Sequence, residues 1–317
     1  MNWFTADIDG PVVVTRTVHF AASAIVAGAL IFRGFIAEPA LRAAPPAGAL
    51  VRRRIRAMVW IGLAVALASG LVWVLLLTMS LSGENLVEAV TSGALRDVLS
   101  LTQFGLVSQI RLALAIVLAI CLVFARSVLW RWLALGLALC LMASLAWTGH
   151  AASTVHALGY LHLASDVLHL TAASAWIGGL VPLALLLGVT RCHRDWASLE
   201  VDVVQRFSTL GTVSVATLIV SGFVNAWILV GSFHGLVVTG YGQLLMFKLA
   251  AFALMLAFAA FNRFALTPRL ALRSDGARQD ALRGLSRNTL IEIALGLSIF
   301  AMVGVLGTLH PAAHLMN

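Results

Sequence analysis

Charged side chains are scarce in this sequence of 317 residues. Asp, Glu, Lys and Arg together make up 11% of the chain, and Lys248 is its single lysine. Soluble globular proteins carry about 25% charged residues, so this composition excludes a protein with a water-soluble surface. Apolar residues make up 61%, and the mean hydropathy is +0.99. The solvent for most of the chain is therefore lipid.

Cysteines and nucleotide-binding motifs are also few or missing. The three cysteines, Cys121, Cys140 and Cys192, form no CxxC pair, which argues against a structural disulfide or a cysteine-based metal relay. The sequence has no phosphate-binding glycine motif and no hydrophilic stretch long enough for an ATPase domain. We therefore expect that the protein is not an enzyme, and that any transport it performs is driven by gradients or by a partner.

Long apolar runs are what the sequence has instead. A spanning helix needs about 20 mainly apolar residues, because about 30 Å of hydrocarbon is crossed at about 1.5 Å per residue. The first run is not a cleavable signal, since Asp7 and Asp9 precede it where a signal has basic residues. The sequence predicts an all-α polytopic membrane protein, a single transmembrane domain over residues 1–317. Its eight transmembrane helices are expected at 11–36, 56–80, 104–126, 130–148, 158–188, 207–231, 241–264 and 287–309.

The arginines predict the orientation of these helices, because cytoplasmic loops accumulate Lys and Arg. Arginine-rich connections follow the first, third, fifth and seventh predicted helices, whereas the other connections are acidic or uncharged. This alternation places both termini outside. It also accounts for the net charge of +8 through topology and contact with anionic membrane lipid, so no nucleic-acid partner is expected.

The histidines are distributed unevenly with respect to this topology. Eight of the nine fall on the outer side or within helices that enter from it, and His193 alone is predicted to be cytoplasmic. His162, Asp166 and His169 are spaced i, i+4, i+7, which places them on one face of the fifth helix. Two imidazoles and a carboxylate on one face suit a metal ion, with Asp166 as ligand or as orienting carboxylate. The alternative is polar packing between helices.

Short similarities between the two parts of the chain predict an internal repeat. VHFAAS around His19 resembles LHLTAAS around His169 at an offset of 150, and Ser69-Gly70 recurs as Ser221-Gly222 at an offset of 152. Similar matches relate the third helix to the seventh and the fourth to the eighth. We therefore expect two parallel four-helix halves, residues 1–155 and 156–317, related by an axis along the membrane normal.

In such an arrangement His19 pairs with His169, His150 with His310, and Arg111 with Lys248. Asp166 and Glu292 have no counterparts in the first half. A site between the halves would be a natural place for a metal ion, and the thioether of Met302 in the eighth helix favours Cu(I) over hard cations. Arg111, Lys248 and Glu292 are expensive inside a membrane and are functional candidates for that reason.

A second hypothesis fits the same residues. Intramembrane histidines on different helices, such as His19 and His169, can also ligate the iron of haem b, with Arg111 and Lys248 pairing with the propionates. The protein would then be an electron-transfer protein. A purely structural role for the histidines is a third possibility.

Four segments resemble the copper resistance protein D family of bacterial inner-membrane proteins, and the resemblance runs nearly from end to end. These are HLTAASAWIGGLVPL, RFSTLGTVSVATLIVSG, YGQLLMFKLAAFALMLAFAAFNRFALTPRL and LGTLHPAAH, at 169–183, 206–222, 241–270 and 306–314. The resemblance implies a role in copper homeostasis, with import of copper across the inner membrane from a periplasmic copper-binding partner.

Combining the resemblance with the residues gives one leading expectation. Outer-face histidines, His150 and His310 among them, capture the copper ion. His162 and His169, with Asp166, pass it into the space between the halves, where His19 and Met302 are further ligands. Arg111 and Lys248 balance Asp166 and Glu292 or gate the path.

Overall fold

The described chain is almost entirely helical. The computed structural model describes residues 9–42, 45–125, 127–149, 156–190, 196–271, 275–311 and 313, and no strand occurs among them. The α-helices are α1 (Gly10–Phe32), α2 (Glu38–Leu41), α3 (Pro45–Ser82), α4 (Leu86–Thr91), α5 (Ala94–Leu101), α6 (Gln103–Val123), α7 (Val128–Ala143), α8 (His156–Ala173), α9 (Gly179–Thr190), α10 (Ala197–Val230), α11 (Phe233–Val238), α12 (Gly240–Phe261) and α13 (Asp275–Leu306).

Short π-helical and 3₁₀ turns join several of these helices into longer rods. π-Helical turns at Arg33–Ala37 and Ser174–Gly178 connect α1 to α2 and α8 to α9. A third π-helical turn, Asn262–Leu266, and a 3₁₀ turn, Thr267–Ala271, extend α12. A 3₁₀ turn at Ser144–Thr148 extends α7. Mid-helix π turns often mark functional positions.

The eight predicted membrane helices are confirmed. Eight helical rods in the described chain are long and apolar enough to cross a membrane: Gly10–Leu41, Gly48–Ser82, Gln103–Val123, Val128–Thr148, Leu158–Thr190, Ser198–Val230, Gly240–Leu270 and Gly276–Leu306. Several are longer than predicted. The second, for example, begins eight residues before position 56, because arginines there can continue a helix beyond the hydrocarbon while their charged ends reach water.

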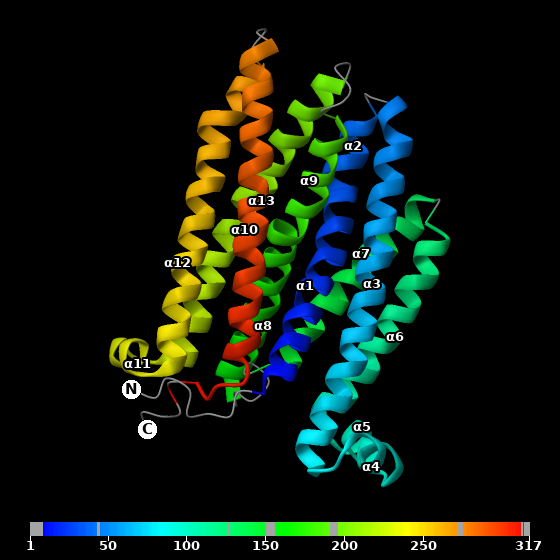
Figure 1. Cartoon of the computed structure of the whole chain (residues 1–317), viewed down its shortest axis with the longest axis vertical. Helices are drawn as coiled ribbons and strands as arrows, with labels where there is room; N and C mark the ends of the chain where they lie inside the picture. Colours follow the sequence, from blue (N-terminus) through cyan, green and yellow to red (C-terminus); the bar gives the residue numbers. More distant parts are fainter. Residues whose placement is uncertain are drawn as a thin grey trace.

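The described helix ends that flank the arginine-rich connections lie together at one end of the bundle (Figure 1, upper end). Glu38 in α2 ties them together, since its carboxylate lies 3.3 Å from Arg33, 3.1 Å from Arg52 and 3.4 Å from Arg131. Arg52 comes from α3 and Arg131 from α7. The shared end agrees with the predicted alternation of the loops, and the assignment of this end to the cytoplasm stays a prediction.

Short helices at the opposite end occupy segments that were predicted only as connections. α4 and α5 precede α6, and α11 precedes α12 (Figure 1, lower end). Thr102 and Thr239 cap the long helices that follow, since their hydroxyls accept from the backbone N–H of Gly105 at 2.9 Å and of Gly242 at 3.0 Å. Helices of six to eight residues are too short to give a clear apolar period in the sequence.

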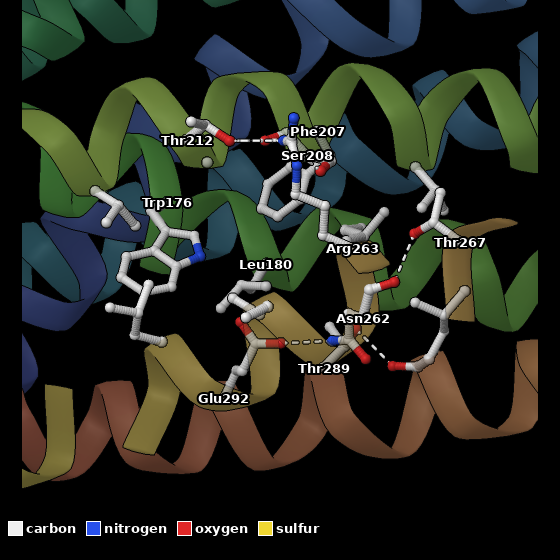
Figure 2. Close-up of a pocket in the computed structure, with 18 of the residues that line it drawn as sticks. Trp176, Leu180, Phe207, Ser208, Thr212, Asn262, Arg263, Thr267, Thr289 and Glu292 are labelled. Atoms are coloured by element: carbon white, nitrogen blue, oxygen red, sulfur yellow. Dashed lines mark hydrogen bonds between the residues drawn. The ribbon is translucent and has the colours of Figure 1, made fainter. Parts of the chain in front are cut away.

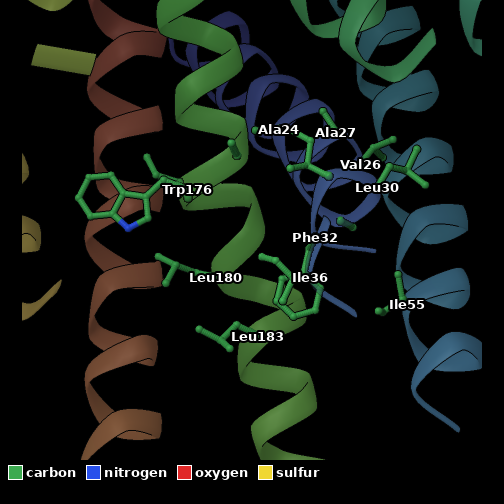
Figure 3. Packing of buried hydrophobic residues seen from close by; sticks show 14 of the residues in the cluster. Ala24, Val26, Ala27, Leu30, Phe32, Ile36, Ile55, Trp176, Leu180 and Leu183 are labelled. Carbon is green, nitrogen blue, oxygen red and sulfur yellow. The ribbon is translucent and has the colours of Figure 1, made fainter. Parts of the chain in front are cut away.

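The centre of the bundle is the crossing of α1 with the α8–α9 rod (Figure 3). A Cβ atom built on Gly28 would lie 2.3 Å from the carbonyl oxygen of Ser174, and one on Gly178 would lie 2.1 Å from that of Ala24. The backbones therefore approach too closely for any larger residue, as in other membrane helix pairs with small residues at the interface. The contact is reciprocal. Gly178 lies 150 positions after Gly28, and Ser174 lies 150 positions after Ala24, so each rod contributes one glycine and one carbonyl.

Large apolar side chains cover the outer faces of the bundle. Leu71, Val123, Phe223, Trp227 and Phe264 are each more than half exposed in the isolated chain. In water such a surface would be unstable, whereas in a bilayer these side chains contact lipid tails. The polar groups described next lie inside the bundle.

Candidate functional site

His162, Asp166 and His169 line one cavity, as their spacing on one helix predicts. This cavity, here called the histidine cavity, has a volume of about 180 Å³ and lies between α1, α8, α10, α12 and α13, near the α11 end. His162 is only 1% exposed, and Asp166 and His169 are half-buried. Helix α8 therefore presents two imidazoles and a carboxylate to a single enclosed space.

A serine on α10 orients His169. The Ser221 hydroxyl donates to the carbonyl of Thr217 at 2.6 Å, so its oxygen accepts from Nδ1 of His169, 3.0 Å away. The Nδ1 atom then carries the ring proton, and Nε2 keeps the lone pair that a metal ion needs. Gly222 next to the serine leaves room for the ring, because a Cβ there would lie 3.4 Å from it.

Polar groups from other helices surround Asp166 in the cavity. Asn225 on α10 donates to Asp166 Oδ1 at 3.2 Å, and Lys248 and Tyr241 from α12 line the same space. Arg16 from α1 lines it too, donating to the carbonyl of Gly307 at 3.0 Å. Its guanidinium also stacks on Trp73, with 5.1 Å between the guanidinium carbon and the ring centroid.

His19 has an equivalent serine but a different neighbour at Nε2. Its Nδ1 lies 3.0 Å from the carbonyl oxygen of Ala66, which can only accept, and 3.1 Å from Ser69 Oγ. The ring proton is therefore on Nδ1, and Nε2 accepts from the Arg111 guanidinium at 2.7 Å. Arg111 also donates to the carbonyl of Leu141 and to Ser144. Both nitrogens of His19 are thus engaged, and a metal ion would have to displace Arg111.

The other predicted ligands lie apart from the histidine cavity. Met302 is half-buried on α13 but is not among the residues that line the cavity, and His310 is exposed beyond the end of α13. His150 lies outside the described residues. Glu292, only 2% exposed, lines a different pocket with Asn262 and Arg263. Within the described ranges, no three His, Cys, Asp or Glu side chains are close enough to share a metal ion.

The histidine pair proposed for haem is not brought together either. His19 lines a separate, mainly apolar cavity of about 550 Å³ with Trp73, Phe104 and Arg111, between α1, α3 and α6. His169 lines the histidine cavity. The two imidazoles therefore face different spaces in this structure.

The lining of the histidine cavity includes polar side chains that were not predicted from the sequence, among them Arg16, Asn225 and Tyr241. Each lies on a different helix from the histidine stripe, so spacing within one helix gave no indication of them. Their rarity in an apolar helix was the available signal. Arg16 is charged inside the first span, and Tyr241 is one of only two tyrosines.

The model of the copper resistance protein D family matches residues 201–306, and that of the copper resistance protein D-like N-terminal domain matches residues 7–160. No solved structure matches the chain.

Three curated relatives are similar over about half of the chain. Copper resistance protein D of Pseudomonas syringae pv. tomato is 36% identical over 178 residues, which cover 54% of this chain and 56% of that protein. Inner membrane protein YebZ of Escherichia coli K12 is 31% identical, over 53% of this chain and 55% of that protein. Copper transport protein CutJ of Bacillus subtilis 168 is 33% identical, over 53% of this chain and 29% of that protein. The chain thus spans about half the length of the first two relatives and less of the third.

Proposed function

The chain belongs to the copper resistance protein D family, and we propose that it moves copper ions across the bacterial inner membrane through the histidine cavity. The direction we propose is import, with a periplasmic copper-binding protein as the donor. The names of the relatives support a copper-handling protein of the inner membrane, since one is named a copper transport protein and another an inner membrane protein.

One observation carries the site: two imidazoles and a carboxylate from α8 line a single buried cavity. Imidazole nitrogen is a good ligand for copper, and His169 has its Nε2 lone pair available because Nδ1 donates to Ser221. Asp166 supplies the negative charge that a cation requires inside a membrane. The ion is the cargo of this cavity, and it enters from the end where Thr148, Gly149 and Gly307 line the opening.

Lys248 and Arg16 also line the cavity, and positive charges repel a cation. In the proposal Arg16 is held on the ring of Trp73 and the carbonyl of Gly307, at the edge of the cavity. Lys248 balances Asp166 while the cavity is empty of cargo, so that the carboxylate is not left buried without a cation. Arrival of copper would then favour movement of the Lys248 ammonium away from Asp166.

The test is the copper and iron content of the purified protein with a double variant, His162→Ala/His169→Ala. His234→Ala is the matched control, since His234 is exposed on α11 outside the cavity lining. We expect stoichiometric copper in the wild type and the control, and its loss in the double variant. Stoichiometric iron with haem absorption bands, or copper retained by the double variant, would contradict the proposal. Uptake of copper into proteoliposomes then tests transport and its direction.

A further inference from the structure

A second cavity lies in the same helices at the arginine-rich end. This glutamate pocket has a volume of about 390 Å³ and is lined by Glu292, Asn262 and Arg263, among others. Helix α10 contributes residues 222–229 to the histidine cavity and residues 204–215 to the glutamate pocket. Helix α13 likewise contributes residues 299–307 to the first and 285–292 to the second. The two spaces are therefore stacked along one set of helices.

The carboxyl group of Glu292 is held by the side-chain amide of Asn262, whose Nδ2 donates to Glu292 Oε1 at 2.8 Å (Figure 2). Asn262 Oδ1 in turn accepts from Asn288 Nδ2 at 2.8 Å. Asn262 begins the π-helical turn Asn262–Leu266, which places this chain of amides where the helix is already irregular. The carbonyl oxygen of the Asn288 side chain is buried without a hydrogen-bond partner in the described structure.

No cation neutralises Glu292 in the part of the chain that the structure describes. Arg263 is the other ionisable residue lining the pocket, and it donates to the backbone and hydroxyl of Ser208 and to Thr212 on α10. Figure 2 shows it directed toward α10, away from Glu292. The remaining polar residues of the lining, Thr267 and Thr289, are uncharged.

Another buried glutamate provides the contrast. Glu200 on α10 is 1% exposed and lies 2.5 Å from the guanidinium of Arg278. Glu292 is 2% exposed, and its partner is the side-chain amide of Asn262 instead of an arginine. Burying an isolated carboxylate is far more costly than burying a neutral carboxylic acid. Glu200 has an arginine to balance a negative charge, whereas Glu292 has no such cation among the described residues, so burial favours its neutral acid form.

A π-helical turn separates the two cavities. Trp176 and Ile177 are consecutive in the turn Ser174–Gly178, yet Trp176 lines the glutamate pocket and Ile177 the histidine cavity. The Trp176 ring stands edge-on to Phe252 of α12, with centroids 5.9 Å apart. Ile177 packs so closely on Gly296 of α13 that a Cβ there would lie 2.5 Å from it. A bulky pair in an irregular turn is suited to be a movable barrier.

We propose that Glu292 is a proton-binding site whose proton is exchanged with water that enters the glutamate pocket. The O–H bond of the carboxylic acid breaks, the proton passes to water in the pocket, and a carboxylate remains. Glu292, Asn262, Thr267 and Thr289 present oxygen atoms to the pocket. Such oxygens are poor ligands for copper but suit a proton relay in a membrane. The coupling of this exchange to copper movement rests on the proposed function, because the new negative charge would attract a cation arriving past Trp176.

The proton site is tested by infrared difference spectroscopy of the full chain in lipid. We expect a carboxylic acid C=O band near neutral pH that is lost in Glu292→Gln and retained in the matched control Glu200→Gln. Loss of no band in Glu292→Gln would overturn the proposal. If that variant does not fold, Asn262→Ala leaves Glu292 in place but removes its hydrogen-bond donor, so the band should shift to higher frequency. An unshifted band would also overturn the assignment.

The coupling is tested in proteoliposomes loaded with a pH-sensitive dye and given Cu(I). Glu292→Gln should retain the wild-type copper content, because the histidine cavity is intact, but its copper flux should no longer respond to a pH gradient. Copper flux in the variant that responds to the gradient like wild type would overturn the coupling. Wild-type protein without any copper flux would contradict the proposed function instead, and the infrared result would still decide the proton site.

Discussion

His19 and His169 occupy similar surroundings on the Nδ1 side of the ring and differ at Nε2. Each ring places Nδ1 against a serine, at 3.1 Å from Ser69 and 3.0 Å from Ser221. In both serines the hydroxyl donates to a backbone carbonyl four residues earlier at 2.6 Å. The tautomer is thereby the same in both clusters. At Nε2, however, His19 meets the guanidinium of Arg111.

The cluster around His169 has Lys248 instead of an arginine, and Nε2 of His169 stays open to a ligand. An arginine forms a rigid fork of donors, and Arg111 uses it to bind His19, Leu141 and Ser144 together. A lysine has one ammonium on a flexible stem, and Lys248 lines the histidine cavity together with Asp166. The comparison indicates that the first cluster holds helices together, and it is consistent with the proposal that the second handles the cargo. We propose that both derive from one ancestral four-helix half.

The largest effect is expected at the crossing of α1 with the α8–α9 rod, because these helices carry His19 and His169. Gly178→Val should lower the free energy of unfolding by about 3 kcal/mol, because the new side chain meets the backbone of Ala24 rather than a movable side chain. Thermal unfolding in lipid measures it. The control is Gly136→Ala, since nothing lies within 4 Å of a Cβ at that position. Equal stability of the two variants would mean that the crossing is looser than described.

The next test replaces Arg111 of the His19 cluster with lysine, the residue type that the His169 cluster has. Arg111→Lys should cost about 2 kcal/mol of stability, because one ammonium cannot reach His19, Leu141 and Ser144 at once and leaves buried acceptors unpaired. Arg96→Lys on the exposed face of α5 is the control. Unfolding in lipid measures both. If Arg111→Lys were as stable as this control, the role of Arg111 in joining helices would be refuted.

The sequence was sufficient for the membrane helices because lipid imposes a strong requirement on composition. Every spanning segment must be apolar over about 20 residues, and this signal does not depend on tertiary contacts. The short helices α4, α5 and α11 lie outside the hydrocarbon, where that requirement does not apply. They were therefore expected only as connections.

The site was predicted in part, for a similar reason. Residues on one helix share a face by their spacing, so the grouping of His162, Asp166 and His169 followed from the sequence alone. Contacts between helices depend on how each helix is rotated. On α13 the cavity is lined at positions 299, 300, 303 and 306, and Met302 falls between them. Neither that rotation nor the contribution of Asn225 could be read from one sequence.

The next test compares the two histidines by the copper affinity of their alanine variants, and its effect on stability is expected to be smaller. His169→Ala should weaken copper binding by about 10- to 100-fold, because Nε2 is a proposed ligand. His19→Ala should change it by less than about threefold, since Arg111 occupies its Nε2. Competition with a Cu(I) chelator on the folded, purified variants measures both affinities. Equal losses would indicate one shared site and contradict the separate cavities.

The smallest expected effect concerns the serines that fix the two rings. Ser221→Ala removes the acceptor of His169 Nδ1–H, so the ring is free to turn and Nε2 is no longer held toward the cavity. Residues that orient a metal-binding histidine usually matter by about tenfold in affinity, and we expect a loss of that size or less. Ser69→Ala is the matched control, because it removes the same contact from a histidine that binds Arg111. The chelator competition should leave this variant at wild-type affinity. If Ser69→Ala weakened copper binding as much as Ser221→Ala, His19 would belong to the path of the ion, and Arg111 would be its gate rather than a structural tie.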